Sequence, residues 1–320
     1  MNFPKIVQFF YLNKKVDVVD DQSIPVSFER SSQDLEKAIQ SIGILHPLLV
    51  RKQKESWQIV SGQARWRYAI QEQIPALEIE CSDIQALLVY LYENQARGFN
   101  PIESARMVSR LYHDFHFSPK EISDSFSSLL GLPTGNKIIT DSISILGMPD
   151  IVLRRIAQNK ISVKNALVLA SFSPEETIQL VQLSDLLNWT GTKQKEAFQW
   201  IWEICKKEHC TVSAFLQQKE FREILSREKP HPESFRQVLY KRKHPQLSAA
   251  QDAFEKSLKE QNIPGTITIT PSNNFEKNDL HVEWSFSSPE SFSKSLESLQ
   301  SLQESKAIEK LFLAQKKHLS

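Results

Sequence analysis

Glycine is scarce in this sequence, with eight among 320 residues. This scarcity argues against a glycine-rich nucleotide-binding βαβ protein and favours helices. Cysteine is rare as well, and Cys81, Cys205 and Cys210 form neither a CxxC motif nor an even set that would predict a disulfide framework. We therefore expect reduced thiols.

Long hydrophobic runs are also missing. No apolar stretch approaches the ~18–20 residues needed to cross a bilayer. We expect no signal peptide, because the first 22 residues carry Lys5, Lys14 and Lys15 without an apolar block. The formal net charge is only +1, with a pI near 7.7, so any basic surface for nucleic acid must be local.

The hydrophobic content of 40 % and the charged content of 24 % are typical of a soluble globular protein. A chain of this length predicts two or three domains. Residues 24–80 have a mixed pattern. We expect helices over 32–42 and 63–73, the second with Trp66, Ala69 and Ile70 inward, and strands over 47–50, 57–60 and 77–80.

Residues 83–214 show apolar positions at helical spacing throughout. Most of the predicted helices begin near a capping residue or a proline. They are expected over 84–93, 101–115, 119–130, 137–146, 149–159, 163–171, 174–187 and 194–206. This pattern predicts a compact helical domain.

Residues 219–245 are richer in lysine and arginine than in glutamate. The segment is interpreted either as a solvated connector or as a tether that also contacts a polyanion. Beyond it, a helix over 247–261, strands over 266–270 and 280–286 and one long helix from Ser288 predict a small ββα unit. Because two strands alone are marginally stable, we expect this unit to dimerise.

Two short motifs combine residues suited to binding anions and metals. In Ile59-Val-Ser-Gly-Gln-Ala-Arg65 a strand runs through a glycine into a helix start, where free N–H groups and guanidinium groups bind phosphate. The second motif is Glu93-Asn-Gln-Ala-Arg97, whose carboxylate and amide oxygens suit Mg²⁺. Alternatively, the first is an ordinary surface corner and the second an intrahelical Glu93–Arg97 pair.

The order of these motifs resembles that of the ParB family of chromosome and plasmid partition proteins. The residues that carry the resemblance are 43–50, 60–69, 93–97, 100–103, 117–122, 145–149, 160–166 and 286–299. The resemblance implies an α+β, multidomain fold. It comprises a small mixed α/β ParB/sulfiredoxin-like N-terminal domain, an all-α helix-turn-helix middle domain and a small ββα C-terminal dimerisation domain. The expected divisions are an arm over 1–22, a nucleotide-binding domain over 23–99, a DNA-binding domain over 100–215, a basic linker over 216–245 and a dimerisation domain over 246–320.

The family resemblance implies a cytoplasmic, nucleoid-associated homodimer that closes as a CTP-gated clamp on palindromic, centromere-like double-stranded DNA. It implies a ParA-like ATPase as a partner, touching the arm, and no membrane. By position, the nucleotide-binding residues are Gly62, Arg65, Glu93, Asn94 and Arg97, with Glu93 and Asn94 also serving Mg²⁺. Dimerisation is expected through Phe292, Leu296, Leu299 and Leu302.

The chain departs from the family at the glycine motif, where Gln63 and Ala64 replace the usual Glu-Arg pair. Gln63 takes the catalytic position, but an amide is a poor base, so we predict weak or absent CTP hydrolysis. Sulfiredoxin is similar to the expected N-terminal fold and has a reactive cysteine just after the glycine. This chain has Gln63 at that position, so we do not expect a sulfiredoxin-type reductase.

The expected DNA-reading helix spans about 136–145 and has one basic residue. The predicted DNA contacts, from this helix and its neighbours, are Lys120, Asn136, Lys137, Thr140, Ser142, Arg154, Arg155, Lys160 and Lys164. Two alternatives remain open. One is a ParB-derived transcription or nucleoid regulator that needs no nucleotide, and the other is a CTP-binding interaction module that does not read DNA.

Overall fold

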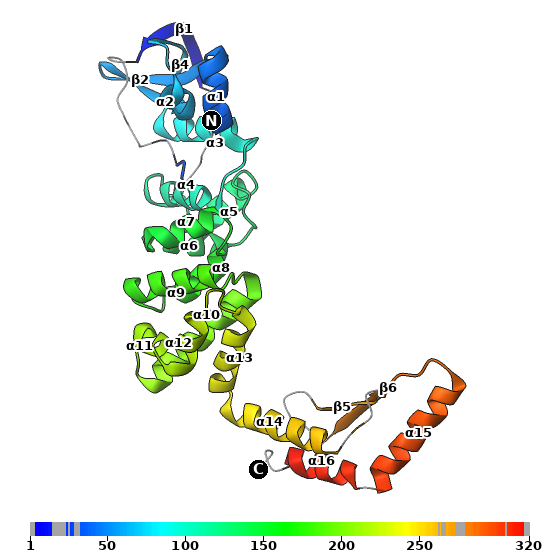
Figure 1. The fold of residues 1–320 in the computed structure, drawn as a ribbon. Coiled ribbons are helices and arrows are strands. Elements are labelled where there is room, and N and C mark those ends of the chain that lie inside the picture. The colour runs from blue at the N-terminus through cyan, green and yellow to red at the C-terminus, as the bar shows by residue number, and fades with distance from the viewer. Residues whose placement is uncertain are drawn as a thin grey trace. The chain divides into compact units, whose positions relative to one another are not determined.

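The computed structural model describes residues 4–14, 24, 26–28, 33–261, 263, 267–272, 279–304 and 306–316 (Figure 1). The chain divides into two compact units. Unit 1 comprises Met1–Asp185 and Trp189–Lys195, and unit 2 comprises Leu186–Asn188 and Glu196–Ser320. Within the described residues, no helix is both long and apolar enough to cross a membrane.

Unit 1 begins with a four-stranded sheet. Its strands are β1 (Lys5–Asn13), β2 (Leu48–Gln53), β3 (Ser56–Ser61) and β4 (Gln73–Glu80). In space their order is β1-β4-β2-β3, with β4 antiparallel to β1 and parallel to β2. The short hairpin of β2 and β3 follows α1 (Gln33–Ile42), which Gly43 ends at a φ of 76°.

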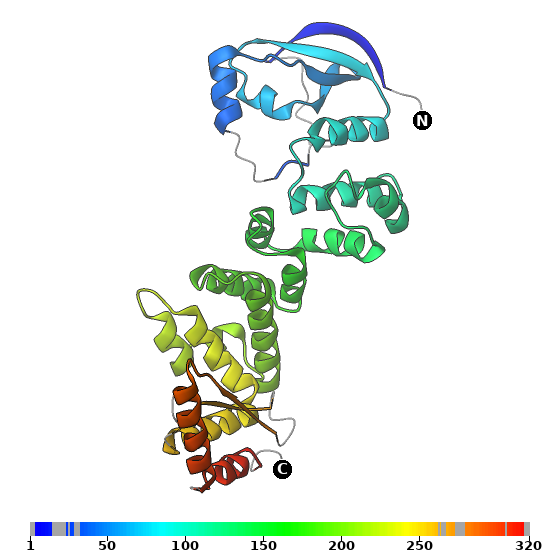
Figure 2. The same ribbon diagram turned by 90° about the vertical axis from the view of Figure 1, so that its right-hand side faces the viewer.

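The two faces of this sheet have separate cores. One core contains Leu12, Leu48 and Ile74, with Trp66 of α2 (Gln63–Tyr68) packed against it. The other face is covered by α3 (Asp83–Gln95), which lies beneath the sheet in Figure 2. The second core continues from Val60 and Ile79 through Tyr90 to Leu111 and Ile139. The sheet and the first helices after it therefore share one hydrophobic core.

The predicted helices and strands of this region occur in the expected order, but one strand was missed and one helix is shorter than predicted. The helix ending at Gly43 is confirmed, and the three strands lie at the expected places with longer extents. Strand β1 was not predicted, because its partner β4 is distant in sequence. The helix over 63–73 is wrong after Tyr68, since Ala69 is already extended. Ile70 is consequently 68 % exposed, whereas Ala69 is buried as expected.

The helices that follow α3 occur in the predicted order, and the last of them, α10, crosses from unit 1 into unit 2 at Glu196. They are α4 (Pro101–His113), α5 (Pro119–Phe126), α6 (Asn136–Ser144), α7 (Asp150–Ala157), α8 (Val163–Leu169), α9 (Pro174–Leu186) and α10 (Gly191–Glu208), with a 3-10 turn at Ile145–Gly147. Complete capping boxes at Ser82, Asn100 and Ser118 start α3, α4 and α5. The helix predicted to reach residue 130 ends at Phe126, which leaves a nine-residue connection before α6.

Unit 2 continues α10 with α11 (Val212–Leu216), α12 (Lys219–Leu225), α13 (Pro232–Lys243) and α14 (Pro245–Glu260). The segment interpreted as a linker over 216–245 is therefore folded. Phe221, Phe235 and Leu239 are fully buried, and the Phe221 and Phe235 rings lie 4.9 Å apart. Their burial explains why this charged segment is helical rather than extended.

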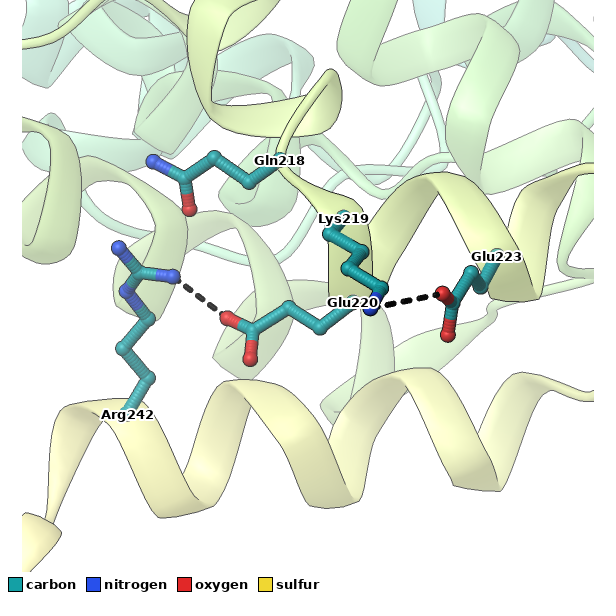
Figure 3. Close-up of a pocket in the computed structure, with 5 residues that line it drawn as sticks. All are labelled: Gln218, Lys219, Glu220, Glu223 and Arg242. Carbon is teal, nitrogen blue, oxygen red and sulfur yellow. Dashed lines mark hydrogen bonds and ion pairs between the residues drawn. The ribbon is translucent and has the colours of Figure 1, made fainter.

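Five of the eight cations of this segment are paired within the unit. Arg242 binds both oxygens of Glu208, at 2.8 and 2.7 Å, and also contacts Glu220 across the pocket in Figure 3. The other pairs are Lys219–Glu223, Arg236–Glu196, Lys241–Asp252 and Lys243–Glu203. Arg222, Arg227 and Lys229 are exposed on the same segment, so its contact with a polyanion stays a prediction.

The end of unit 2 contains β5 (Ile267–Pro271), β6 (Leu280–Trp284), α15 (Pro289–Glu304) and α16 (Ala307–Lys316). The antiparallel strand pair packs with α14 and α16 through Phe254, Ile267 and Leu311. Thr266, the predicted first residue of the strand, lies outside the described residues. The single long helix predicted here is wrong, because Lys306, at a φ of 57°, separates α15 from α16.

Candidate functional site

A tight corner joins β3 to α2 at Gly62. Its φ of 108° is unfavourable for any side chain, and a Cβ atom there would lie 2.5 Å from Cδ2 of Leu48 and 3.2 Å from Nε of Arg65. The glycine thus lets the backbone pass directly under the Arg65 guanidinium. The sequence motif is confirmed as a strand–glycine–helix corner.

Arg65 is fixed across this corner. Its Nη1 donates hydrogen bonds to the carbonyl oxygens of His46, at 2.7 Å, and Pro47, at 3.0 Å. Burial lowers the pKa of Arg65, and the negative charge of Glu93 acts in the opposite direction. Its Nε and Nη2 have no hydrogen-bond partner among the described residues. The side chain therefore presents donors for an anion while its other edge is held by the backbone.

Gln63 is occupied by the backbone of the preceding strand. Its Nε2 donates to the carbonyl oxygen of Ile59 at 2.9 Å and lies 3.4 Å from that of Val60. The side chain is half-buried. These bonds fix the orientation of the side chain, and an amide has no basic atom to offer to a water molecule.

The second motif is organised around Glu103 rather than Glu93. Arg97 follows the end of α3, and its Nη1 lies 3.2 Å from the fully buried Glu103 carboxylate. Its Nε donates to Oδ1 of Asn94 at 2.7 Å, and the Asn94 amide donates to the carbonyl oxygen of Tyr90 at 2.8 Å. The alternative Glu93–Arg97 pair is not formed. Sequence reasoning missed the role of Glu103, although its Asn-Pro-x-Glu capping pattern was visible.

The predicted Mg²⁺ ligands fit only in part. Glu93 is exposed, whereas the side-chain oxygen of Asn94 already accepts from Arg97. In the part of the chain that the structure describes, no group of three or more histidine, cysteine, aspartate or glutamate side chains could hold a metal ion. A magnesium ion here would take most of its oxygen ligands from a bound nucleotide and water.

Helices α5 and α6 form the expected helix-turn-helix arrangement. Their long connection is held at two points, where Gly135 donates its N–H to Oγ of Ser123 and Ser104 donates to the Leu130 carbonyl oxygen, both at 2.8 Å. Ile139 of α6 is fully buried in the shared core. This contact fixes which face of α6 points outward.

The outward face of α6 carries Asn136, Lys137 and Thr140, all of which are exposed. Lys137 forms an ion pair with Asp141 at 2.9 Å, so the net charge of this surface is small. Ser142 was predicted to contact DNA, but it is buried and its hydroxyl donates a hydrogen bond to the Ile138 carbonyl oxygen at 2.8 Å. Its position at i+3 from Ile139 places it on the packed face.

The neighbouring cations divide into two kinds. Lys120, Lys160 and Lys164 are exposed on the surface, as is Arg154, whose guanidinium lies 3.8 Å from Asp150. Arg155 instead binds Asp185 at 2.7 Å and also contacts Gln158, which ties α7 to α9. Arg155 is therefore a structural residue in this conformation.

The chain has a mixed α/β domain followed directly by a helix-turn-helix domain, and family models match both domains in this order. A model described as "ParB N-terminal domain" matches residues 14–95, and one described as "ParB HTH domain" matches residues 97–199. Together these two matches span more than half of the chain. The chain belongs to the ParB family.

Curated relatives agree with this assignment. The chromosome-partitioning protein ParB of Myxococcus xanthus is 28 % identical over 145 residues, which are 44 % of this chain and 47 % of that protein. The nucleoid occlusion protein of Shouchella clausii is 27 % identical over 167 residues, covering 51 % of this chain and 57 % of that protein. The matched part is about half the length of these relatives.

The solved structures that match this chain include two of the C-terminally truncated chromosome-partitioning protein ParB from Caulobacter crescentus. The one complexed to the centromeric parS site is 20 % identical, with a TM-score of 0.37, and the match covers 60 % of this chain and 99 % of that chain. The one complexed with CTP-gamma-S is 22 % identical, with a TM-score of 0.26, and the match covers 55 % of this chain and 98 % of that chain.

Proposed function

We propose that the protein is a partition protein that binds a palindromic, centromere-like site in double-stranded DNA as a dimer. The observation that carries this proposal is the helix-turn-helix arrangement, in which Ile139 anchors α6 and Asn136 and Thr140 face outward. Amide and hydroxyl groups on the exposed face of such a helix read base edges in the major groove.

Helix α6 is the proposed recognition helix, and the phosphate contacts are proposed to come from residues on either side of it in the sequence. Lys120, Arg154, Lys160 and Lys164 are exposed and surround the recognition helix in the sequence. Because Asp141 neutralises Lys137 and Asp150 lies 3.8 Å from Arg154, the three lysines supply most of the attraction to the DNA backbone. Base discrimination then depends on Asn136 and Thr140.

The dimer is proposed to form through the C-terminal ββα unit. Phe292 and Leu296 of α15 are partly exposed at 37 % and 41 %, and Trp284 and Phe286 are exposed beside them in sequence. Leu302 is excluded from this surface, because it is buried in the protomer's own core, and Leu299 packs against that core. A two-fold dimer would match the symmetry of a palindromic site.

CTP is proposed to gate the closure of this dimer into a clamp. The Nε–Nη2 edge of Arg65 beside Gly62 offers two donors to the phosphates. The exposed carboxylate of Glu93 would serve Mg²⁺. Asn94 and Arg97 would support the site through their mutual hydrogen bond. Because Gln63 has an amide in place of a carboxylate, hydrolysis is proposed to be slow or absent.

A ParA-like ATPase is the proposed protein partner, and the nucleoid is the proposed location. The expected contact lies in the N-terminal arm, residues 1–22. In this segment Lys14 donates a hydrogen bond to the carbonyl oxygen of Ala69, at 2.5 Å, and Lys5 begins β1. Lys15 lies outside the described residues. The contact is therefore expected to use surface other than Lys14.

DNA binding is tested by selection from random duplexes, followed by salt titration. The selected site should be palindromic, and Thr140→Ala should relax its sequence at one position in each half. Lys164→Ala should instead weaken binding to all sequences and reduce the salt dependence by about one phosphate contact. Affinity that is the same for every sequence would contradict the proposal.

Nucleotide binding is tested by isothermal titration with CTP and Mg²⁺, with ATP as the control ligand. Arg65→Ala should abolish CTP binding, whereas Arg67→Ala, on the exposed side of the same helix, should preserve it. If CTP does not bind at millimolar concentration, the clamp cycle is wrong and DNA binding stands alone.

A further inference from the structure

Strand β1 is an uncovered edge of the sheet in unit 1. The strand order leaves one side of β1 without a partner among the described strands, and both views show no described helix or strand beyond it (Figures 1 and 2). Its sequence from Val7 to Asn13 contains no charged residue and no proline. Charges and prolines are the usual protection of an edge strand against pairing.

The exposed side chains of this strand are large and apolar. Phe9 is 53 % exposed and Tyr11 is 59 % exposed, and their rings form an edge-to-face pair with centroids 5.5 Å apart. They lie over Leu77 and Pro75 of β4, on the sheet face that α3 covers elsewhere. Neither aromatic ring is part of the hydrophobic cores of the unit.

We propose that β1 pairs antiparallel with β1 of a second copy of this chain, about a two-fold axis at Phe10. In this register Phe9 of one copy faces Tyr11 of the other, twice, and Gln8 faces Leu12. The four aromatic rings then form one cluster, and cross-strand aromatic pairs of this kind stabilise sheets. No charged side chain within the paired segment faces another.

The strand also sets the limit of the contact. A β-bulge lies between Ile6 and Gln8, so regular pairing about Phe10 extends over Gln8 to Leu12 only. Such a short contact covers much less than the ~1,600 Å² of a standard interface, so it is weak by itself. Where the C-terminal dimer of the proposed function tethers two copies, the pairing becomes intramolecular and more fully occupied.

The test is disulfide trapping in the full chain. Phe9→Cys and Tyr11→Cys chains are co-expressed with different affinity tags and oxidised. The proposed register places these two cysteines directly opposite, while the other Tyr11–Phe9 pair stays intact. Two Phe9→Cys chains would have Cα atoms about 8 Å apart, from a two-residue offset of strands about 4.8 Å apart, which is too far for a disulfide.

We expect the mixed sample to cross-link at least ten-fold more than either variant alone. Ile70→Cys, at a more exposed apolar position away from β1, and the native chain with its three free cysteines are the controls. Phe9→Lys should remove the protection from hydrogen exchange of the β1 amides that point away from β4, whereas Ile70→Lys should not, and the amides bonded to β4 stay protected in both. Equal cross-linking in mixed and single samples, or protection of the outward-facing β1 amides that persists in Phe9→Lys, would overturn the pairing. This result would leave the DNA and CTP tests unaffected.

Discussion

Replacing Glu103 by glutamine should open the junction between α3 and α4. The carboxylate is fully buried and accepts hydrogen bonds from the Asn100 N–H at 3.0 Å and from Arg97 at 3.2 Å. It also lies 3.4 Å from the N–H of Phe28. A glutamine has the same shape, but its NH₂ group must face one of these donors.

The cost follows from this loss of an acceptor. A buried hydrogen bond to a charged group contributes about 1.5–3 kcal/mol. Arg97 is 29 % exposed and can turn partly to water, which reduces the loss. We expect a destabilisation of about 2 kcal/mol, equivalent to roughly 30-fold faster exchange of the α4 amides.

Native-state hydrogen exchange is the appropriate assay, because a chain of two units need not unfold in one step. Glu175→Gln, at an exposed position of α9, is the control. A double-mutant cycle with Arg97→Gln should give a coupling energy of about 1 kcal/mol or more. Less than a two-fold change in exchange for Glu103→Gln, or strict additivity in the cycle, would refute this account of the junction.

Other predictions concern unit 2 and the glycine corner. The hydrogen bond from Arg242 lowers the pKa of Glu208. The stability from this pair is therefore present above the unfolded-state pKa and is lost as pH falls through the lower folded-state pKa. Arg242→Met should reduce the free energy of unfolding by about 1 kcal/mol at pH 7 and by little in acid, measured by urea unfolding. Gly62→Ala should cost more than about 1 kcal/mol by thermal unfolding and abolish CTP binding, because its Cβ meets Leu48. Gln63→Glu should raise CTP hydrolysis, measured as phosphate release; an unchanged rate would show that this position does not limit turnover.

Local sequence signals predicted much of the helical region. The capping residues Asn100 and Ser118 marked helix starts because the side chain that caps a helix lies next to the N–H groups it satisfies. Helix ends were less certain. Phe126 and Tyr68 end their helices earlier than periodicity suggested, because Leu130 and Ala69 continue the apolar spacing and are buried without being helical.

The candidate site was predicted in part. Gly62 and Arg65 were recognised from a short motif, and their local geometry matches it. The partner of Arg97 was not, because Glu103 comes from the next helix and the turn between them decides the contact. Ser142 was assigned to the DNA surface from its chemistry alone, whereas its burial depends on the packing of α6.

The sequence by itself determined the family, the order of the elements and the chemistry available at each motif, because these depend on residue type and short-range spacing. The tertiary structure decided which charges are already neutralised, as Arg242 is by Glu208, and which apolar residues remain exposed, as Phe9 and Tyr11 do on β1. Both outcomes arise from contacts between segments distant in sequence. Long-range packing therefore separates the side chains that hold the fold together from those free to bind a partner.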